Sequence, residues 1–168
     1  MKSFVCLLAL MFAVPQGPSK NFPVDSTVVK QRDFASFRTY AWAPGHEAFD
    51  RAAHKSIVAA VDSEMAGLGF KQADAATADV TIRYHSVLST EVDLKALDKM
   101  GKDAAGKAPT NKLGILAVAM HDRPGQQIWA AKTRAYVDTT ASPDQTIRTV
   151  VQRLFETYPT RKSGSGKS

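Results

Sequence analysis

Hydrophobic and polar positions are most clearly ordered between Leu113 and Val137. An apolar run from Leu113 to Met120 is followed by a polar stretch that contains Pro124-Gly125, and a second apolar run begins at Ile128. Proline presets φ at the second position of a tight turn, and glycine accepts the positive φ that follows it in a type II turn. The pattern therefore predicts a β-hairpin.

The two strands of this hairpin differ in the polarity of their faces. The first strand is apolar on both faces, which is typical of a strand in the middle of a sheet. The second strand alternates: Trp129, Ala131 and Thr133 share one face, while Lys132, Arg134 and Tyr136 lie on the other.

Three further strands are expected upstream. The first is a short edge strand within residues 21–30. The second ends an aromatic stretch and places Tyr40 and Trp42 on one face. The third covers residues 78–88, where Arg83 and His85 alternate with apolar side chains.

Two stretches follow the 3.6-residue period of an amphipathic helix. In residues 50–68 the apolar stripe is followed by Gly69-Phe70, which predicts a Schellman stop with Gly69 in the left-handed conformation. In the second stretch Ser142 begins a capping box, the apolar stripe runs to Tyr158, and Pro159 ends the helix. Residues 89–112 lie between two strands and are predicted to form a long loop with at most a short helical turn.

The element order predicts an α+β fold. A strand–helix–strand crossover is usually right-handed and makes its two strands parallel, and the hairpin then adds antiparallel strands. Each helix has one apolar stripe, so both can cover the same face. We expect a two-layer α/β sandwich with a mixed, mostly antiparallel sheet of four to five strands and two helices on one face. The other face is expected to be solvated or covered by a partner, and its candidate partner-binding residues are Arg83, His85, Lys132, Arg134 and Tyr136.

The formal net charge of +6 comes largely from the ends of the chain. Omitting Lys2, Arg161, Lys162 and Lys167 leaves about +2, which is ordinary for a domain of this size. Nucleic acid is therefore not an expected partner, because a nucleic-acid interface shows a clustered basic face.

Residues 1–19 have the pattern of a secretory signal peptide, with Lys2 before an uncharged apolar run from Phe4 to Val14. This run is shorter than the roughly 20 residues that span a bilayer, so no transmembrane span is expected in the mature protein. Residues 20–160 are expected to form a single domain, and residues 161–168 a disordered basic tail. The one cysteine, Cys6, lies inside the leader, so the mature chain would lack a thiol.

Several segments resemble one family of bacterial envelope proteins, many of them lipoproteins, that is known as a domain of unknown function (number forty-one thirty-six). The similar segments are Asp33 to Trp42, Gly67 to Phe70, Ala78 to Tyr84, Leu113 to Ala131 and the helix that ends at Pro159. The resemblance covers roughly residues 33–159 and implies an exported, envelope-associated protein, periplasmic or attached to the outer envelope. Cys6 comes before the apolar run is complete, unlike a lipobox cysteine, so a lipid anchor is not expected.

No residue pattern points to catalysis or to a cofactor. His46, His54, His85 and His121 are scattered, although His85 could approach the His121-Asp122 pair if their strands are neighbours. Asp33 and Asp79 fit turn and strand-start roles, and Asp62 has no partner at a spacing that fixes a catalytic pair. No metal site, cofactor or enzymatic activity is therefore expected, and a hydrolase without a recognisable motif stays as the remote alternative.

Tyr40, Trp42 and Trp129 could line a groove for a small ligand, although such aromatics more often form the core beneath helices. Two hypotheses remain. The chain is a non-enzymatic interaction or structural module of the cell envelope, or it is a periplasmic carrier with a pocket between sheet and helices. The sequence does not identify the envelope protein or small ligand that would bind, and it leaves the oligomeric state open.

Overall fold

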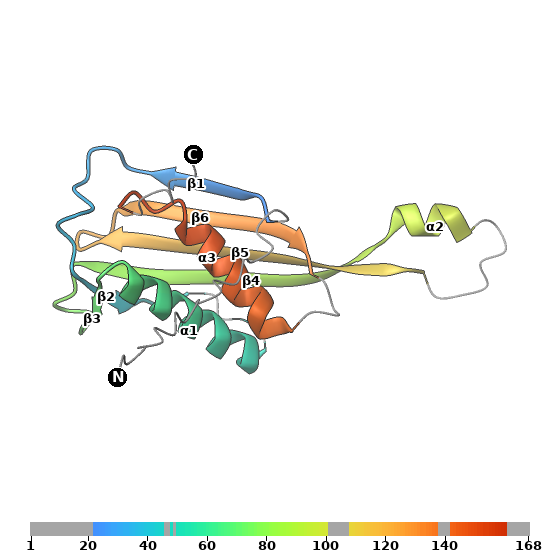
Figure 1. Cartoon of the computed structure of the whole chain (residues 1–168), viewed down its shortest axis with the longest axis horizontal. Helices are drawn as coiled ribbons and strands as arrows, with labels where there is room; N and C mark the ends of the chain where they lie inside the picture. The colour runs from blue at the N-terminus through green and yellow to red at the C-terminus, as the bar shows by residue number, and fades with distance from the viewer. Residues whose placement is uncertain (1–21, 46–47, 49, 101–107, 138–141, 161–168) are drawn as a thin grey trace, which may run out of the picture.

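The described part of the chain is built on a mixed sheet of six strands in the order β1-β6-β5-β4-β2-β3 (Figure 1). The computed structural model describes residues 22–45, 48, 50–100, 108–137 and 142–160. The strands are β1 (Val24–Val28), β2 (Thr39–Trp42), β3 (Lys71–Gln72), β4 (Val80–Val92), β5 (Thr110–Asp122) and β6 (Gln127–Tyr136). The helices are α1 (Arg51–Gly67), α2 (Leu94–Met100) and α3 (Pro143–Phe155). The predicted signal peptide and basic tail lie outside the described residues.

The predicted α+β class and the two-layer arrangement are confirmed in outline, because α1 and α3 lie together on one face of the sheet (Figure 1). The expected numbers of elements were too low, since the sheet has six strands and the described chain has three helices. The strand that was missed, β3, has only two residues, and α2 stands apart from the helical layer.

The predicted hairpin is formed by β5 and β6, and β5 lies centrally between β6 and β4. Gly125 has the expected positive φ of 89°. The turn differs from the predicted type II turn, because the Gly125 N–H donates to the Asp122 carbonyl at 2.8 Å and so places Arg123 and Pro124 at the centre. A β-bulge after Met120 leaves Ile128 as an extra residue on β6, and Ile128 joins Trp129 in the core.

The β2–α1–β4 crossover has parallel strands, as predicted. Asp50 caps α1 by accepting a hydrogen bond from the Ala52 N–H at 2.8 Å. At the other end Gly69 has φ +88°, and the Phe70 N–H donates to the Met65 carbonyl at 3.0 Å. This is the predicted Schellman stop, and it turns Phe70 into the same core as Met65.

The second long helix begins at Pro143 after Ser142, as predicted. The capping box is not formed as expected, because the Ser142 side chain makes no cap hydrogen bond. The helix also ends earlier than expected, at Phe155. Residues 156–158 continue as tighter turns, in which the Tyr158 N–H donates to the Phe155 carbonyl at 3.0 Å.

Residues 89–112 are not the long loop that was expected. Strand β4 continues to Val92, α2 follows, and β5 begins at Thr110; residues 101–107 lie outside the described part. The register runs without interruption from Val80 opposite Asp122 to Val92 opposite Thr110. Polar residues in this stretch concealed two strand ends, because a strand that projects beyond the helical layer has no core face to keep apolar.

The core lies between the sheet and the two long helices, and Trp129 is its largest fully buried side chain. Its ring is 5.1 Å from Phe155 and 5.6 Å from Tyr158, centroid to centroid, and its Nε1–H donates to Thr157 Oγ1 at 3.3 Å. Phe34 meets Tyr158 edge to face at 5.5 Å. The C-terminal end of α3 is thereby fixed to β6 and to the loop that follows β1.

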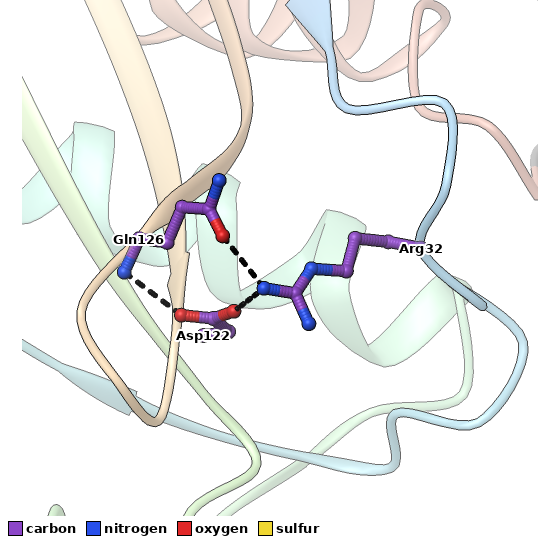
Figure 2. Close-up of polar contacts among 3 residues, drawn as sticks. All are labelled: Arg32, Asp122 and Gln126. Atoms are coloured by element: carbon purple, nitrogen blue, oxygen red, sulfur yellow. Dashed lines mark hydrogen bonds and ion pairs between the residues drawn. The ribbon is translucent and has the colours of Figure 1, made fainter.

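The tip of the hairpin is tied to the loop after β1 by an ion pair (Figure 2). Arg32 Nη2 lies 2.6 Å from Asp122 Oδ2 and donates to Gln126 Oε1 at 2.7 Å. The other carboxylate oxygen, Asp122 Oδ1, accepts the Gln126 N–H at 2.8 Å. The Asp122 side chain is only 5% exposed, so the Arg32 guanidinium is the counter-ion of a nearly buried carboxylate.

We predict that Trp129→Ala lowers the free energy of unfolding by about 3–5 kcal/mol, because it removes a fully buried ring and leaves a cavity. Urea denaturation followed by circular dichroism measures this loss. The matched control on the same strand is Lys132→Ala, an exposed position that should change stability by no more than about 0.5 kcal/mol. Equal effects of the two changes would contradict this description of the core.

We predict that Arg32→Met destabilises the fold by about 1–3 kcal/mol, because the buried Asp122 carboxylate then loses its cation. Denaturation midpoints measure the change. Arg148→Met, at an exposed position of α3, is the control for loss of one positive charge and should be nearly neutral. A neutral Arg32→Met would show that the ion pair does not hold the hairpin tip.

Candidate functional site: the projecting arm and the polar sheet face

The distal parts of β4 and β5 project from the body together with α2 (Figure 1). We call residues 87–100 and 108–114 the arm. Large hydrophobic side chains are exposed at eight described positions, and six of them belong to the arm: Val87, Leu88, Val92, Leu94, Leu97 and Met100. A seventh, Tyr136, lies opposite Leu113 of the arm. The exposed apolar surface of the described chain is thus concentrated in one region.

Asp93 fixes α2 to the end of the two strands. Its Oδ1 accepts the Ala96 N–H at 3.0 Å, and its Oδ2 accepts from Asn111 Nδ2 at 3.0 Å. The Asp93 N–H donates to the Pro109 carbonyl at 2.8 Å. The hydrogen bond from Ala96, followed by that from Asn111, holds the pKa of the Asp93 carboxyl below its usual range. The arm is therefore an ordered element with a defined end.

The face of the sheet opposite the long helices, which we call the polar sheet face, carries the five residues that were predicted for it. These are Arg83, His85, Lys132, Arg134 and Tyr136. Arg134 Nη2 contacts Glu91 Oε1 at 3.3 Å, and the Tyr136 hydroxyl donates to Glu91 Oε2 at 3.4 Å. Lys132 lies 3.9 Å from Asp25 of β1, with both side chains largely exposed. The structure thus joins Arg134 and Tyr136 through Glu91, a residue that sequence reasoning did not single out.

Arg83 and His85 occupy the same face, on β4, but they are not equivalent. His85 is exposed, whereas Arg83 is half-buried, and Arg83 Nε and His121 Nδ1 are buried without a hydrogen-bond partner among the described residues. Burial, and next the positive charge of Arg83, lower the pKa of His121 below 6.5; Asp122 opposes this. His121 pairs with Thr81, four positions or roughly 13 Å along β4 from His85, so the two histidines do not meet.

The three aromatics considered for a groove do not lie together. Tyr40 and Trp42 are on β2, and Trp129 is on β6, with β4 and β5 between them; this places the strands roughly 14 Å apart. The Tyr40 hydroxyl and the Trp42 Nε1–H both donate to Asp62 Oδ1 of α1, at 2.7 and 2.9 Å. Burial and this carboxylate raise the pKa of Tyr40 above its usual range. Asp62 thus attaches α1 to β2, a role that the sequence did not reveal.

Two further polar side chains, Tyr84 and Asp79, organise the edge of the sheet near β2. The Tyr84 hydroxyl accepts the Ala48 N–H at 3.0 Å and lies 2.6 Å from His54 Nδ1. The Asp79 carboxylate accepts the backbone N–H groups of Arg38 and Thr39, at 2.9 and 3.0 Å, and these contacts lower its pKa. Asp33 accepts the Ala35 N–H at 3.0 Å and so has the expected turn role.

Two surface pockets of about 410 and 420 Å³ are lined by residues outside the arm and outside the polar sheet face. The first is lined by Phe34, Phe37, Arg38, Leu68 and Phe70, among others, and the second by Pro23, Val24 and Arg153 with neighbouring residues. Neither is lined by Tyr40, Trp42 or Trp129. Within the described ranges, no cluster of three or more metal-ligating side chains occurs.

The comparisons with known proteins place the chain in a family. Residues 24–160 match the family described as "Domain of unknown function (DUF4136)". The chain belongs to this family. Among curated proteins, none matches this DUF4136 chain in sequence. In the described part of the chain, no helix has the length and apolar character needed to cross a membrane.

Solved structures show that the fold recurs in other bacterial proteins. A PDZ domain protein from Parabacteroides distasonis has 16% identity and a TM-score of 0.58 over 84% of this chain, but the match spans only 36% of that protein. PelC from Paraburkholderia phytofirmans, solved as a dodecamer, is 12% identical with a TM-score of 0.50, covering 79% of this chain and 96% of PelC. A PelC variant, also a dodecamer, gives a TM-score of 0.51 at 11% identity. These likenesses show the fold alone.

We predict that the protein loses stability on acidification from about pH 7 to about pH 5 and that His121 causes part of this loss. The pKa of His121 is lowered from 6.5 in the folded chain, so the unfolded chain binds the proton first as the pH falls. The free energy of unfolding therefore decreases through and below pH 6.5. Thermal melts of His121→Gln and His121→Asn should show a shallower decrease than the natural protein. Parallel slopes for all three would exclude His121 as the cause.

Proposed function

We propose that this chain is an exported, non-enzymatic module of the bacterial cell envelope that binds a protein partner through the arm. One observation carries the proposal: six of the eight exposed large hydrophobic side chains lie on the arm. Exposed apolar side chains that gather in one region of a protein mark an interaction site more often than scattered ones do. The arm is also the part that projects farthest from the body (Figure 1).

The polar surroundings of the arm suit a protein–protein interface. Leu94 and Leu97 of α2 are 73% and 38% exposed, and they alternate with Lys95 and Asp98. Arg134 and Glu91 form an ion pair near the base of the arm. An apolar centre with a charged rim is the usual anatomy of such an interface.

Export is supported by the leader-like residues 1–19 and by the resemblance to envelope proteins. Assembly is compatible with the fold, since PelC, which shares it, is a dodecamer. The periplasmic or outer-envelope location and the protein partner are our inference from these features.

The carrier alternative receives less support from the structure. It needs a cavity near Trp42 and Trp129, but Trp129 is fully buried against Phe155 and Tyr158. Trp42 is half-buried with its indole N–H bonded to Asp62. The two described pockets open elsewhere on the surface.

A photo-crosslinking residue placed at position 94 tests the proposal in bacterial cells that express the full chain. We expect Leu94 variants to form discrete protein adducts in the periplasmic or membrane fraction. The matched control places the same residue at Lys55, an exposed position of α1 that is not part of the arm. It should give few adducts.

Replacing Leu94, Leu97 and Met100 with serine should reduce the adducts formed through other arm positions at least tenfold while leaving the melting temperature nearly unchanged, because α2 contributes no buried residue. Equal labelling from positions 94 and 55 would contradict the arm as the binding element. Recovery of the protein in the cytosolic fraction would contradict export.

A further inference from the structure

The outer edge of β4 changes character along its length. Strand β2 pairs with β4 only from Val80 to Ile82, and the Ala43 N–H then donates to the Ile82 carbonyl at 2.8 Å. Gly45 lies against the Tyr84 carbonyl so closely that a Cβ there would be 2.6 Å from it. Beyond this point, no strand of the described part pairs with β4 on the side opposite β5.

Backbone alternation identifies the groups on this edge. Because the Ile82 carbonyl points toward β2, residues an even number of positions further along β4 direct their N–H and C=O groups the same way. These residues are Ser86, Leu88 and Thr90. The intervening residues pair with β5. An unpaired row of this kind is a template for an added strand.

The sequence of this edge lacks the features that usually protect one. Residues 86–92 contain no proline and no lysine, and the one charged residue, Glu91, is held by Arg134. Val87 and Leu88 are 54% and 64% exposed. The other two edges differ: β3 has only two residues, and β1 carries Asp25 next to Lys132.

We propose that the β4 edge of residues 86–90 pairs antiparallel with the same edge of a second copy of this chain, with a two-fold axis at Leu88. This deepens the proposed function by naming the partner of the arm, and it rests on that function. In this register Leu88 lies opposite Leu88 of the second copy, and Ser86 lies opposite Thr90. The pairing is isologous, so each copy contributes the same surface and the assembly closes as a dimer.

Complementarity on both faces selects this register. On the helix side, the exposed Leu88 side chains cover one another, while the hydroxyl-bearing Ser86 and Thr90 face each other. On the open face, Val87 lies opposite Ser89, and the His85 imidazole lies opposite the Glu91 carboxylate of the second copy. A shift of the axis to Ser89 would instead place Glu91 opposite Val87 and Leu88 opposite Thr90. Cross-strand pairs of like polarity stabilise a sheet, and mismatched ones do not.

Cysteine crosslinking tests the register. With Cys6→Ser, the sole native cysteine is absent, so an introduced cysteine is the only thiol. Directly opposite residues of a hydrogen-bonded antiparallel pair have Cα atoms about 5.5 Å apart, within disulfide range. We expect Leu88→Cys in the full chain to form a covalent dimer under mild oxidation. Val87→Cys mixed with Ser89→Cys should crosslink as a pair far more than either does alone. Ala59→Cys, on the exposed face of α1, is the control.

Native mass spectrometry should give twice the mass of one chain for the natural protein. Leu88→Lys should raise the dissociation constant of the dimer at least tenfold, since it places two like charges at the axis. Lys55→Leu should leave this constant unchanged. A monomer at all concentrations, or preferential self-crosslinking at Ser89 or Ala59, would overturn the proposal. If the protein is a monomer but position 94 still forms adducts with other proteins, the proposed function stands and only the self-pairing is wrong. If neither a dimer nor such adducts form, both proposals are wrong.

Discussion

The structure depends on the burial of Trp129 between the β5–β6 hairpin and the end of α3. The indole meets Phe155 and Tyr158, and Tyr158 in turn meets Phe34 from the loop after β1 and Phe70 from the end of α1. Four segments that are distant in sequence therefore share one aromatic cluster. Because large rings dominate the free energy of a small core, the position of this cluster determines where the helical layer can lie on the sheet.

Neighbouring strands pair with only part of the two longest strands, β4 and β5. Each of β4 and β5 has 13 residues, whereas β2 pairs with three positions of β4 and β6 ends opposite Leu113. The arm is what remains of β4 and β5 beyond these neighbouring strands. Its exposed apolar side chains and the open edge of β4 follow from the same mismatch in strand length. The binding that we propose therefore arises from the architecture of the sheet and not from a pocket or a catalytic group.

The sequence predicted the elements whose signals are local. The alternation in β6, the Schellman stop at Gly69 and the apolar stripe of α3 each lie within a few residues, and all three are present. The extension of β4 and β5 was missed, because strand residues outside a core carry no periodic pattern. The two-residue β3 forms only through its parallel pairing with β2.

Long-range polar contacts could not be inferred either. Arg32 and Asp122 are 90 positions apart. Asp62 of α1 accepts hydrogen bonds from Tyr40 and Trp42 of β2. The polar sheet face holds the residues that alternation assigned to it, since alternation alone sets which side of a strand a residue occupies. Its role in partner binding stays a prediction. Its internal pairing through Glu91 depends on the register between β4, β5 and β6, which no pattern in the chain specifies.

Amide hydrogen exchange along β4, measured over a range of protein concentrations, tests most directly whether its edge is the recognition element. The N–H groups of Val87 and Ser89 point to β5 and should be protected at every concentration. Those of Ser86, Leu88 and Thr90 point outward, and we predict that their protection rises with concentration as the second copy binds. Fast exchange of these three amides at all concentrations, beside slow exchange at Val87 and Ser89, would contradict it.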